Sequence, residues 1–228
     1  MPCFLAGRAA AYALAAGVGC KVDEFSHQSG HLMAALYSSG AFEKLLEAPF
    51  AAFHVSGGTT ELLYVTPHDA GFSVVQIGGT ADLNAGQAID RAGVMMGLRF
   101  PAGKELERFA NELPTEWTEP VKVSVKDGVC HLSGLQNLAE DLWKSTSNAA
   151  LVGQFVFAFI GKTLVKMTEY ADSLYPGIPV LYAGGVMSNR YLQKLLSKPS
   201  GVYFAEPEFS ADNAAGIALL TRRAHQQN

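Results

Sequence analysis

Two apolar runs in this chain each end in a pair of glycines. Residues 50–55 break into Ser56-Gly57-Gly58, and residues 180–183 break in the same way into Gly184-Gly185. Short apolar runs bounded by such turn signals predict buried strands. Glycine lets a backbone approach a ligand closely and adopt positive φ angles without steric cost. Two such loops predict a phosphate or nucleotide held by main-chain N–H groups, although either loop alone is more often an ordinary tight turn.

The size and charge of the chain limit what it can be. Its 228 residues suffice for one large domain or two small lobes with a core. The formal net charge of −4, without a basic run, gives no reason to expect tight unaided binding to nucleic acid. Cys3, Cys20 and Cys130 lack metal-ligand spacing, which predicts reduced thiols in a cytoplasmic protein. The apolar stretch 4–19 is interrupted by Arg8 and is too short to span a bilayer. We therefore expect it to form a core helix, and we expect no membrane among the partners of the protein.

Hydrophobic periodicity and turn residues divide the chain into alternating strands and helices. The N-terminal part predicts a helix at 4–17, a short strand at 20–25 and a helix from 26 to 39. The further strands are predicted at 50–55, 60–66, 72–77, 121–125, 129–132, 178–183 and 201–205. The further helices are predicted at 82–97, 102–112, 148–173, 188–197 and 211–224.

From residue 50 onward this order resembles one half of the actin-like fold of sugar kinases and heat-shock ATPases. Such folds usually hold two copies of the unit, with a nucleotide in the cleft between them. We therefore expect an α/β protein in which the second lobe is complete and the first is truncated. Residues 1–26 would be a remnant of the N-terminal lobe. Residues 27–228 would form the C-terminal actin-like lobe, with a mostly helical insert at about 98–175.

His27 and His31 lie one helical turn apart, so their imidazoles point the same way with Cβ atoms roughly 6 Å apart. That separation suits two ligands of one metal ion, and the alternative is a pair of histidines that flank a helix start. Asp212 is a candidate third ligand, or else an N-cap that competes with Ser210. Two histidines and a carboxylate leave coordination positions open, which is typical of Fe(II) and possible for Zn(II). Spacing alone does not bring Asp212 to His27.

Three other polar residues have two interpretations each. Asp82 and Asp90 lie near one face of a predicted helix, where a carboxylate could accept hydrogen bonds from ribose hydroxyls. Alternatively, Asp82 caps that helix and Asp90 pairs with Arg91 or Lys104. Asn189 follows the second glycine pair and either caps its own helix or binds a ligand.

Six ordered motifs, taken together, resemble one protein family over nearly the whole chain, from Pro2 to about Arg222. They are His27-Gln28-Ser29-Gly30-His31, Val55-Ser56-Gly57-Gly58-Thr59-Thr60-Glu61-Leu62, Asp82-Leu83-Asn84-Ala85-Gly86-Gln87-Ala88-Ile89-Asp90-Arg91, Gly97-Leu98-Arg99-Phe100-Pro101-Ala102-Gly103, Ala183-Gly184-Gly185-Val186-Met187-Ser188-Asn189 and Asp212-Asn213-Ala214-Ala215. The family is that of the TsaD-type tRNA threonylcarbamoyladenosine synthases, once called O-sialoglycoprotein endopeptidases or glycoproteases.

The resemblance implies an acyltransferase with a defined site. His27, His31 and Asp212 would hold one divalent metal ion, Fe(II) or Zn(II), acting as a Lewis acid and template. The enzyme would move a threonylcarbamoyl group from its adenylate to the exocyclic amine of the tRNA adenosine beside the anticodon. The acidic balance of the chain separately predicts that any tRNA contact depends on partner proteins. ATP or the adenylate would bind His54, Val55, Ser56, Gly57, Gly58, Asp90, Gly103, Gly184, Gly185 and Asn189.

The chain departs from the family pattern in three places. Family members carry a longer N-terminal part, Thr59 stands where they often have a histidine, and Ala102 replaces a glycine. These departures favour a divergent paralogue. The apolar helix at 4–17 further predicts either that Met1 is an internal methionine of a longer protein or that another chain covers the helix, in a homodimer or with a homologous subunit.

Two alternatives to the transferase stay open. A non-catalytic homologue could serve as a dimerisation or complex-forming partner, but such partners typically lack the pair of histidines that is present here. A metalloprotease is less well supported. In metalloproteases with a His-Glu-x-x-His helix, the glutamate after the first histidine is the general base, whereas Gln28 stands at that position here.

Overall fold

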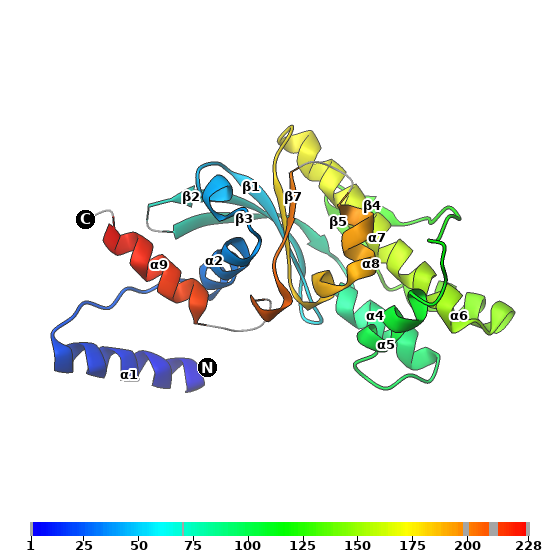
Figure 1. The fold of residues 1–228 in the computed structure, drawn as a ribbon, viewed down its shortest axis with the longest axis horizontal. Coiled ribbons are helices and arrows are strands. Elements are labelled where there is room, and N and C mark those ends of the chain that lie inside the picture. Colours follow the sequence, from blue (N-terminus) through cyan, green and yellow to red (C-terminus); the bar gives the residue numbers. More distant parts are fainter. Residues whose placement is uncertain (1, 70, 198–200, 210–213, 227–228) are drawn as a thin grey trace.

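The computed structural model describes residues 2–69, 71–197, 201–209 and 214–226. Within them the chain forms a twisted mixed sheet with helices on both faces (Figure 1). The strand order is β4-β5-β3-β2-β1-β6-β7. The strands are β1 (Phe50–Val55), β2 (Thr60–His68), β3 (Gly71–Thr80), β4 (Ser124–Lys126), β5 (Val129–His131), β6 (Val180–Ala183) and β7 (Val202–Phe204).

The pairing of the central strands sets the position of the two glycine loops. Strands β1, β2 and β3 form an antiparallel meander, and β1 also pairs in parallel with β6, which in turn pairs in parallel with β7. In the β1–β6 pair, His54 is opposite Ala183. Both strands therefore end at the same edge of the sheet, and the two predicted glycine loops are neighbours.

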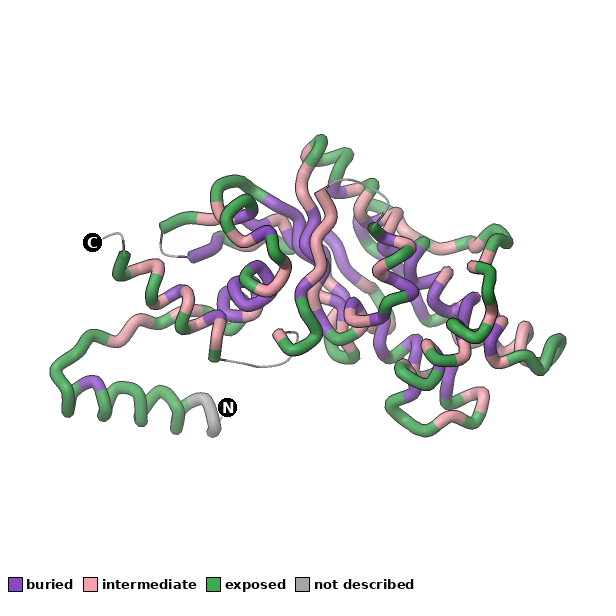
Figure 2. The backbone as a smooth tube through the Cα atoms, viewed as in Figure 1, coloured by how far each residue is buried: buried purple, intermediate pink, exposed green. Residues whose placement is uncertain are grey.

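Successive side chains of the central strands point to opposite faces of the sheet and pack into two separate hydrophobic cores. Phe53 and Tyr182 stack at 4.8 Å on one face, whereas Phe50 and Ala52 pack on the other. Figure 2 shows the buried stretch running through the middle of the sheet. The first face is covered by α4 (Ala85–Met95), α5 (Gly103–Ala110), α6 (Leu135–Thr146), α7 (Ala149–Leu174) and α8 (Arg190–Leu196). The second face is covered by α2 (His27–Ser38), α3 (Phe42–Leu46) and α9 (Ala215–Gln226).

Helix α7 is the central helix of the first core. By length and hydropathy it could cross a membrane, but 67% of its apolar window is buried inside the protein. Its 26 residues bury side chains on more than one face, from Ala150 to Ala171. The packing of α7 between the sheet and its neighbours therefore accounts for its apolar composition.

Helix α1 (Pro2–Val18) corrects one expectation. Its helical state is as predicted, but the prediction of a core helix is wrong. Leu5, Leu14 and Val18 are 65%, 71% and 76% exposed, and only Ala15 is buried among its described side chains. Figures 1 and 2 show α1 lying apart from the sheet. Its side-chain hydrogen bonds to the rest of the described chain run from Arg8 and Tyr12 to Glu24.

The strand predicted at 20–25 is also wrong, because this segment has no regular secondary structure and pairs with no described strand. One of its apolar residues contacts a core instead of a sheet: Phe25 packs against the α2/α9 core. Asp23 Oδ2 accepts a hydrogen bond at 2.8 Å from Nε2 of His225 in α9. The segment is thus an anchored connection between α1 and α2.

Several boundaries differ from the predicted ones. The helix predicted at 82–97 begins at Ala85 behind the cap Asn84, and the strand predicted at 121–125 is reduced to Ser124–Lys126. The helix predicted at 188–197 begins at Arg190 behind the cap Asn189, and the short 3-10 helix η1 (Gly185–Ser188) precedes it. A second 3-10 helix, η2, spans Pro207–Phe209. Helices α3 and α6 were not predicted. The division into an N-terminal remnant, a C-terminal lobe and an insert stays a prediction.

Candidate functional site

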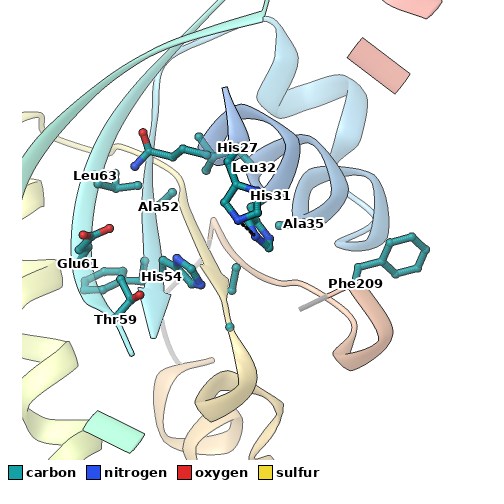
Figure 3. A pocket seen from close by; sticks show the side chains of 14 residues that line it. His27, His31, Leu32, Ala35, Ala52, His54, Thr59, Glu61, Leu63 and Phe209 are labelled. Atoms are coloured by element: carbon teal, nitrogen blue, oxygen red, sulfur yellow. Dashed lines mark hydrogen bonds between the residues drawn. The ribbon is translucent and has the colours of Figure 1, made fainter. Parts of the chain in front are cut away.

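A cavity of about 280 Å³ opens at the carboxyl ends of β1 and β6, between the sheet and α2. This is the edge of an α/β sheet at which ligands usually bind. Figure 3 shows side chains from α2, β1 and β2 that converge on the cavity. Its lining consists of His27, Gln28, His31, Leu32, Ala35, Ala52, Phe53, His54, Thr59, Glu61, Leu63, Ala183, Gly184 and Phe209.

His27 and His31 lie together on the first turns of α2, as predicted from their spacing. Ser26 begins the helix by accepting a hydrogen bond from the Ser29 N–H at 3.0 Å, which fixes where the first turn starts. The two Nε2 atoms are 3.0 Å apart, and the rings meet edge to face with centroids 4.4 Å apart. Both side chains reach the same cavity (Figure 3).

The distance between the two Nε2 atoms is compatible with the binding of one metal ion by both rings. Two imidazole nitrogens bound to one ion at about 2.1 Å and at right angles would lie about 3.0 Å apart. Asp212, the predicted third ligand, lies outside the described residues. Among the residues that are described, no group of three histidine, cysteine, aspartate or glutamate side chains could hold a metal ion. The histidine pair is therefore the described part of the predicted metal site.

His54 brings a third imidazole to the cavity from β1. Its ring centroid lies 5.7 Å from that of His31, and the ring projects toward the histidine pair (Figure 3). Burial lowers the pKa of His54, and the neighbouring rings of His31 and His27 lower it further. A neutral ring offers one lone pair and one N–H group to a ligand.

The Ser56-Gly57-Gly58 loop uses part of its own hydrogen-bonding capacity. Ser56 Oγ accepts hydrogen bonds from the N–H groups of Gly58 at 3.1 Å and Thr59 at 3.0 Å. One donor of the predicted nucleotide-binding set, the Gly58 N–H group, is thus hydrogen-bonded inside the loop, as is the neighbouring Thr59 N–H group. Gly57 and Gly58 are exposed, and a Cβ added to either would meet nothing within 4 Å.

Gly184 and Gly86 are required by close packing of the backbone around this loop. Gly184 has φ +101°, and a Cβ there would lie 2.3 Å from the carbonyl oxygen of Val55. A Cβ on Gly86, at the start of α4, would lie 2.7 Å from Gly57. These glycines thus bring three loops together at the sheet edge, whereas Gly185 faces open space.

Asp82 and Asp90 both hold neighbouring loops. Asp82 accepts hydrogen bonds from the N–H groups of Leu83, Leu132 and Ser133, at 2.6, 2.8 and 3.1 Å. Burial alone would raise the pKa of Asp82, but these hydrogen bonds outweigh it and hold the pKa well below its usual value. Asp90 accepts from the Ala102 N–H at 2.7 Å rather than pairing with a basic side chain.

Asn189 caps α8, as one of its two interpretations predicted. Its Oδ1 accepts a hydrogen bond from the Leu192 N–H at 2.9 Å, and the residue is 7% exposed. Gly103 is the first residue of α5, where an added Cβ would make an ordinary contact at 3.7 Å with Ile89.

Residues 1–219 match the family model described as TsaD, tRNA N6-adenosine threonylcarbamoyltransferase. The chain belongs to this family.

Curated relatives support the same assignment. The tRNA N6-adenosine threonylcarbamoyltransferase of Streptococcus suis strain 05ZYH33 is 34% identical over 226 residues, which is 94% of this chain and 65% of that protein. The protein of the same name from Streptococcus pneumoniae strain CGSP14 is 33% identical over 228 residues, with 95% and 65% covered. The chain thus spans about 65% of the length of the curated relatives it matches.

Two solved structures are similar in fold. Full-length HypF in its phosphate- and nucleotide-bound form matches with a TM-score of 0.67 and 14% identity, over 91% of this chain and 36% of HypF. The activator of the 2-hydroxyisocaproyl-CoA dehydratase from Clostridium difficile, with bound ADPNP, matches with a TM-score of 0.50 and 14% identity, over 89% and 69%. The fold is therefore that of the actin-like ATPases, as predicted.

The cavity gathers some of the predicted residues and not others. It is lined by His27, His31, His54 and Gly184. The remaining described members of the predicted set do not line it: Val55, Ser56, Gly57, Gly58, Asp90, Gly103, Gly185 and Asn189. Sequence reasoning missed Thr59 and Glu61 as lining residues. The signal was available in the hairpin, since strand alternation places Glu61 opposite His54.

Proposed function

We propose that this chain carries out, or contributes the central site for, threonylcarbamoyl transfer to the exocyclic amine of the tRNA adenosine beside the anticodon. The observation that supports this most is the His27–His31 pair, with Nε2 atoms 3.0 Å apart, in a cavity at the ends of β1 and β6 of a TsaD-family chain. Transfer RNA is the natural substrate class for this family. The protein would then act in the cytoplasm.

The reaction has simple requirements. The amine nitrogen attacks the carbonyl carbon of the threonylcarbamoyl adenylate, the bond from that carbon to the phosphate oxygen breaks, AMP leaves, and the amine loses one proton. A divalent ion, Fe(II) or Zn(II), bound by His27, His31 and Asp212 would supply Lewis-acid polarisation of a phosphate or carbonyl oxygen. The neutral His54 would orient a donor or acceptor group of the substrate beside that pair.

The adenylate would lie against the joined glycine loops. Gly57 and Gly58 leave room for it because nothing lies within 4 Å of an added Cβ. No lysine or arginine is among the described residues that line the cavity. Compensation of phosphate charge would therefore come from the metal and from main-chain N–H groups of these loops other than those of Gly58 and Thr59, which already donate to Ser56 Oγ.

The first experiment measures metal content and nucleotide binding in the same preparations. We expect about one Fe or Zn per chain in the unaltered protein, and loss of that metal in the His27→Ala, His31→Ala double variant. His68→Ala is the matched control, since His68 is an exposed histidine at the far end of β2. Titration with a non-hydrolysable ATP analogue should show binding that is strengthened by the metal.

The outcomes separate the possibilities. Equal metal content in the double variant and the His68→Ala control would overturn the proposed metal site. Metal binding without any nucleotide binding would support the proposed metal site. It would contradict the proposal that this chain by itself is a transferase.

We also propose that another chain covers α1, either a second copy in a homodimer or a homologous subunit. The exposed Leu14 and Val18 lie one helical turn apart on α1 and form one apolar patch, which supports this proposal because exposed apolar patches mark contact surfaces. The net charge of −4 further favours tRNA contact that depends on partner proteins.

A further inference from the structure

A second cavity, of about 470 Å³, lies on the opposite face of the sheet from the histidine cavity. Val180 and Tyr182 of β6 face it, whereas Leu181 and Ala183 face the α2 side. It is formed by the C-terminal half of α7, by β6 and β7, and by α8. Its lining consists of Val165, Thr168, Glu169, Asp172, Gly177, Ile178, Val180, Tyr182, Leu195, Leu196 and Val202.

The deep part of this second cavity is apolar. Val180 and Leu196 are 3% and 2% exposed, and Ile178 and Val202 pack against the same core. Two hydroxyl groups are also present, but they are already hydrogen-bonded. Thr168 Oγ1 donates to the Leu164 carbonyl at 2.9 Å and shares a 2.7 Å hydrogen bond with the Tyr182 hydroxyl. A ligand therefore needs no polar group at its buried end.

The mouth of the cavity is acidic. Glu169 and Asp172 are exposed residues on the last turns of α7 that also line the cavity. Asp172 Oδ1 accepts a hydrogen bond from the Gly177 N–H at 2.8 Å, which fixes its position and leaves further acceptor capacity on the carboxylate. Helix α7 ends at Leu174, and a helix C-terminus carries partial negative charge. No basic side chain belongs to the described lining.

We propose that this second cavity binds a small amphipathic amine, with an apolar body against Val180 and Leu196 and an ammonium group beside Glu169 and Asp172. The volume lies within the range of about 300–1,000 Å³ found for small-molecule pockets. An apolar interior with an acidic mouth disfavours anions such as carboxylates and phosphates, whereas the histidine cavity is expected to receive a phosphate group. The site is therefore chemically distinct from that of the proposed transferase.

The test uses three ligands of equal chain length and different charge: hexylammonium, hexanol and hexanoate. Each is titrated into the full chain while backbone amide resonances are followed by NMR. We expect hexylammonium to shift resonances of the lining residues in a saturable way. Hexanol should bind at least about threefold more weakly, and hexanoate should bind more weakly still.

Two variants locate the binding. Glu169→Gln removes one charge with little change of shape and should weaken hexylammonium binding about two- to fivefold, with little effect on hexanol. Glu140→Gln is the matched control, since Glu140 lies on α6, pairs with Lys144 and does not line the cavity. Val165→Phe fills the space and should abolish binding of both hexylammonium and hexanol.

Each contrary result overturns the proposal. It is wrong if none of the three ligands shifts the lining resonances, or if hexanoate binds as tightly as hexylammonium. It is also wrong if Glu169→Gln and Glu140→Gln have equal effects. Should Val165→Phe fail to fold, the comparison of the two glutamate variants still decides.

Discussion

His54 of β1 is directly opposite Glu61 of β2 in the antiparallel ladder, and both side chains line the histidine cavity. Residues opposite each other in such a ladder have Cβ atoms about 4.5–5.5 Å apart and point to the same face. The same face carries Ala52 and Leu63, the preceding opposite pair, which belongs to the core. A buried apolar pair is thus followed by a polar pair where the core opens into the cavity.

Glu61 places negative charge in a cavity that we expect to receive an anionic adenylate. Glu61→Gln removes that charge at nearly constant shape and should tighten binding of an ATP analogue about two- to fivefold at low salt, because repulsion is relieved. The effect should decrease at high salt, where charges are screened. Titration calorimetry at two salt concentrations measures both. Glu43→Gln, at an exposed position on α3, is the control, and weaker binding by Glu61→Gln would contradict the expectation.

Gly184 should tolerate no side chain. Its positive φ and the 2.3 Å approach of an added Cβ to the Val55 carbonyl oxygen both oppose alanine. Gly184→Ala should lower the free energy of unfolding by about 2–4 kcal/mol. Gly58→Ala should cost less than about 1 kcal/mol, because its Cβ would meet open space and its φ is not positive. Urea unfolding of both variants checks the difference, and equal losses would contradict it.

Local sequence determined much of this fold and part of the site. The strands at 50–55 and 60–66 could be predicted because apolar runs and glycine turns act over a few residues. The His27–His31 pair could be predicted because one helical turn fixes it. The proximity of the two glycine loops could be predicted because the β/α order suggested that the two preceding strands end at the same edge of the sheet.

The features that could not be predicted from the sequence depend on packing between segments that are far apart in the chain. Residues 20–25 have the composition of a strand but no partner, and Phe25 reaches a core instead. Helix α1 is as apolar as a core helix, yet burial depends on what else packs there. Asp90 and Asn189 look like ligand residues in a motif, while their described hydrogen bonds go to the Ala102 and Leu192 backbone.

Asp82 should make stability depend on pH. Its pKa in the folded protein is lowered from an ordinary value of 3.8. The ionised carboxylate therefore contributes fully to the free energy of unfolding above pH 3.8, and this contribution is lost as the pH falls below 3.8. Asp82→Asn should cost about 1 kcal/mol at neutral pH, where the ionised carboxylate accepts three backbone hydrogen bonds. The difference between the two proteins should shrink below pH 3.8. Urea unfolding from pH 7 to pH 2.5 measures it, and a difference that is constant with pH would exclude this account.

Helix α1 should govern self-association or association with a homologous subunit. Leu14→Glu with Val18→Glu places two charges on its exposed apolar surface, and such charges oppose burial in an interface. If the protein is a homodimer, light scattering after size-exclusion chromatography should show half the mass for this double variant. Val75→Glu is the control, since Val75 is 58% exposed on β3 and α1 lies apart from the sheet (Figure 1). A mass unchanged by the α1 substitutions but halved by Val75→Glu would place the interface on the sheet and contradict the role of α1.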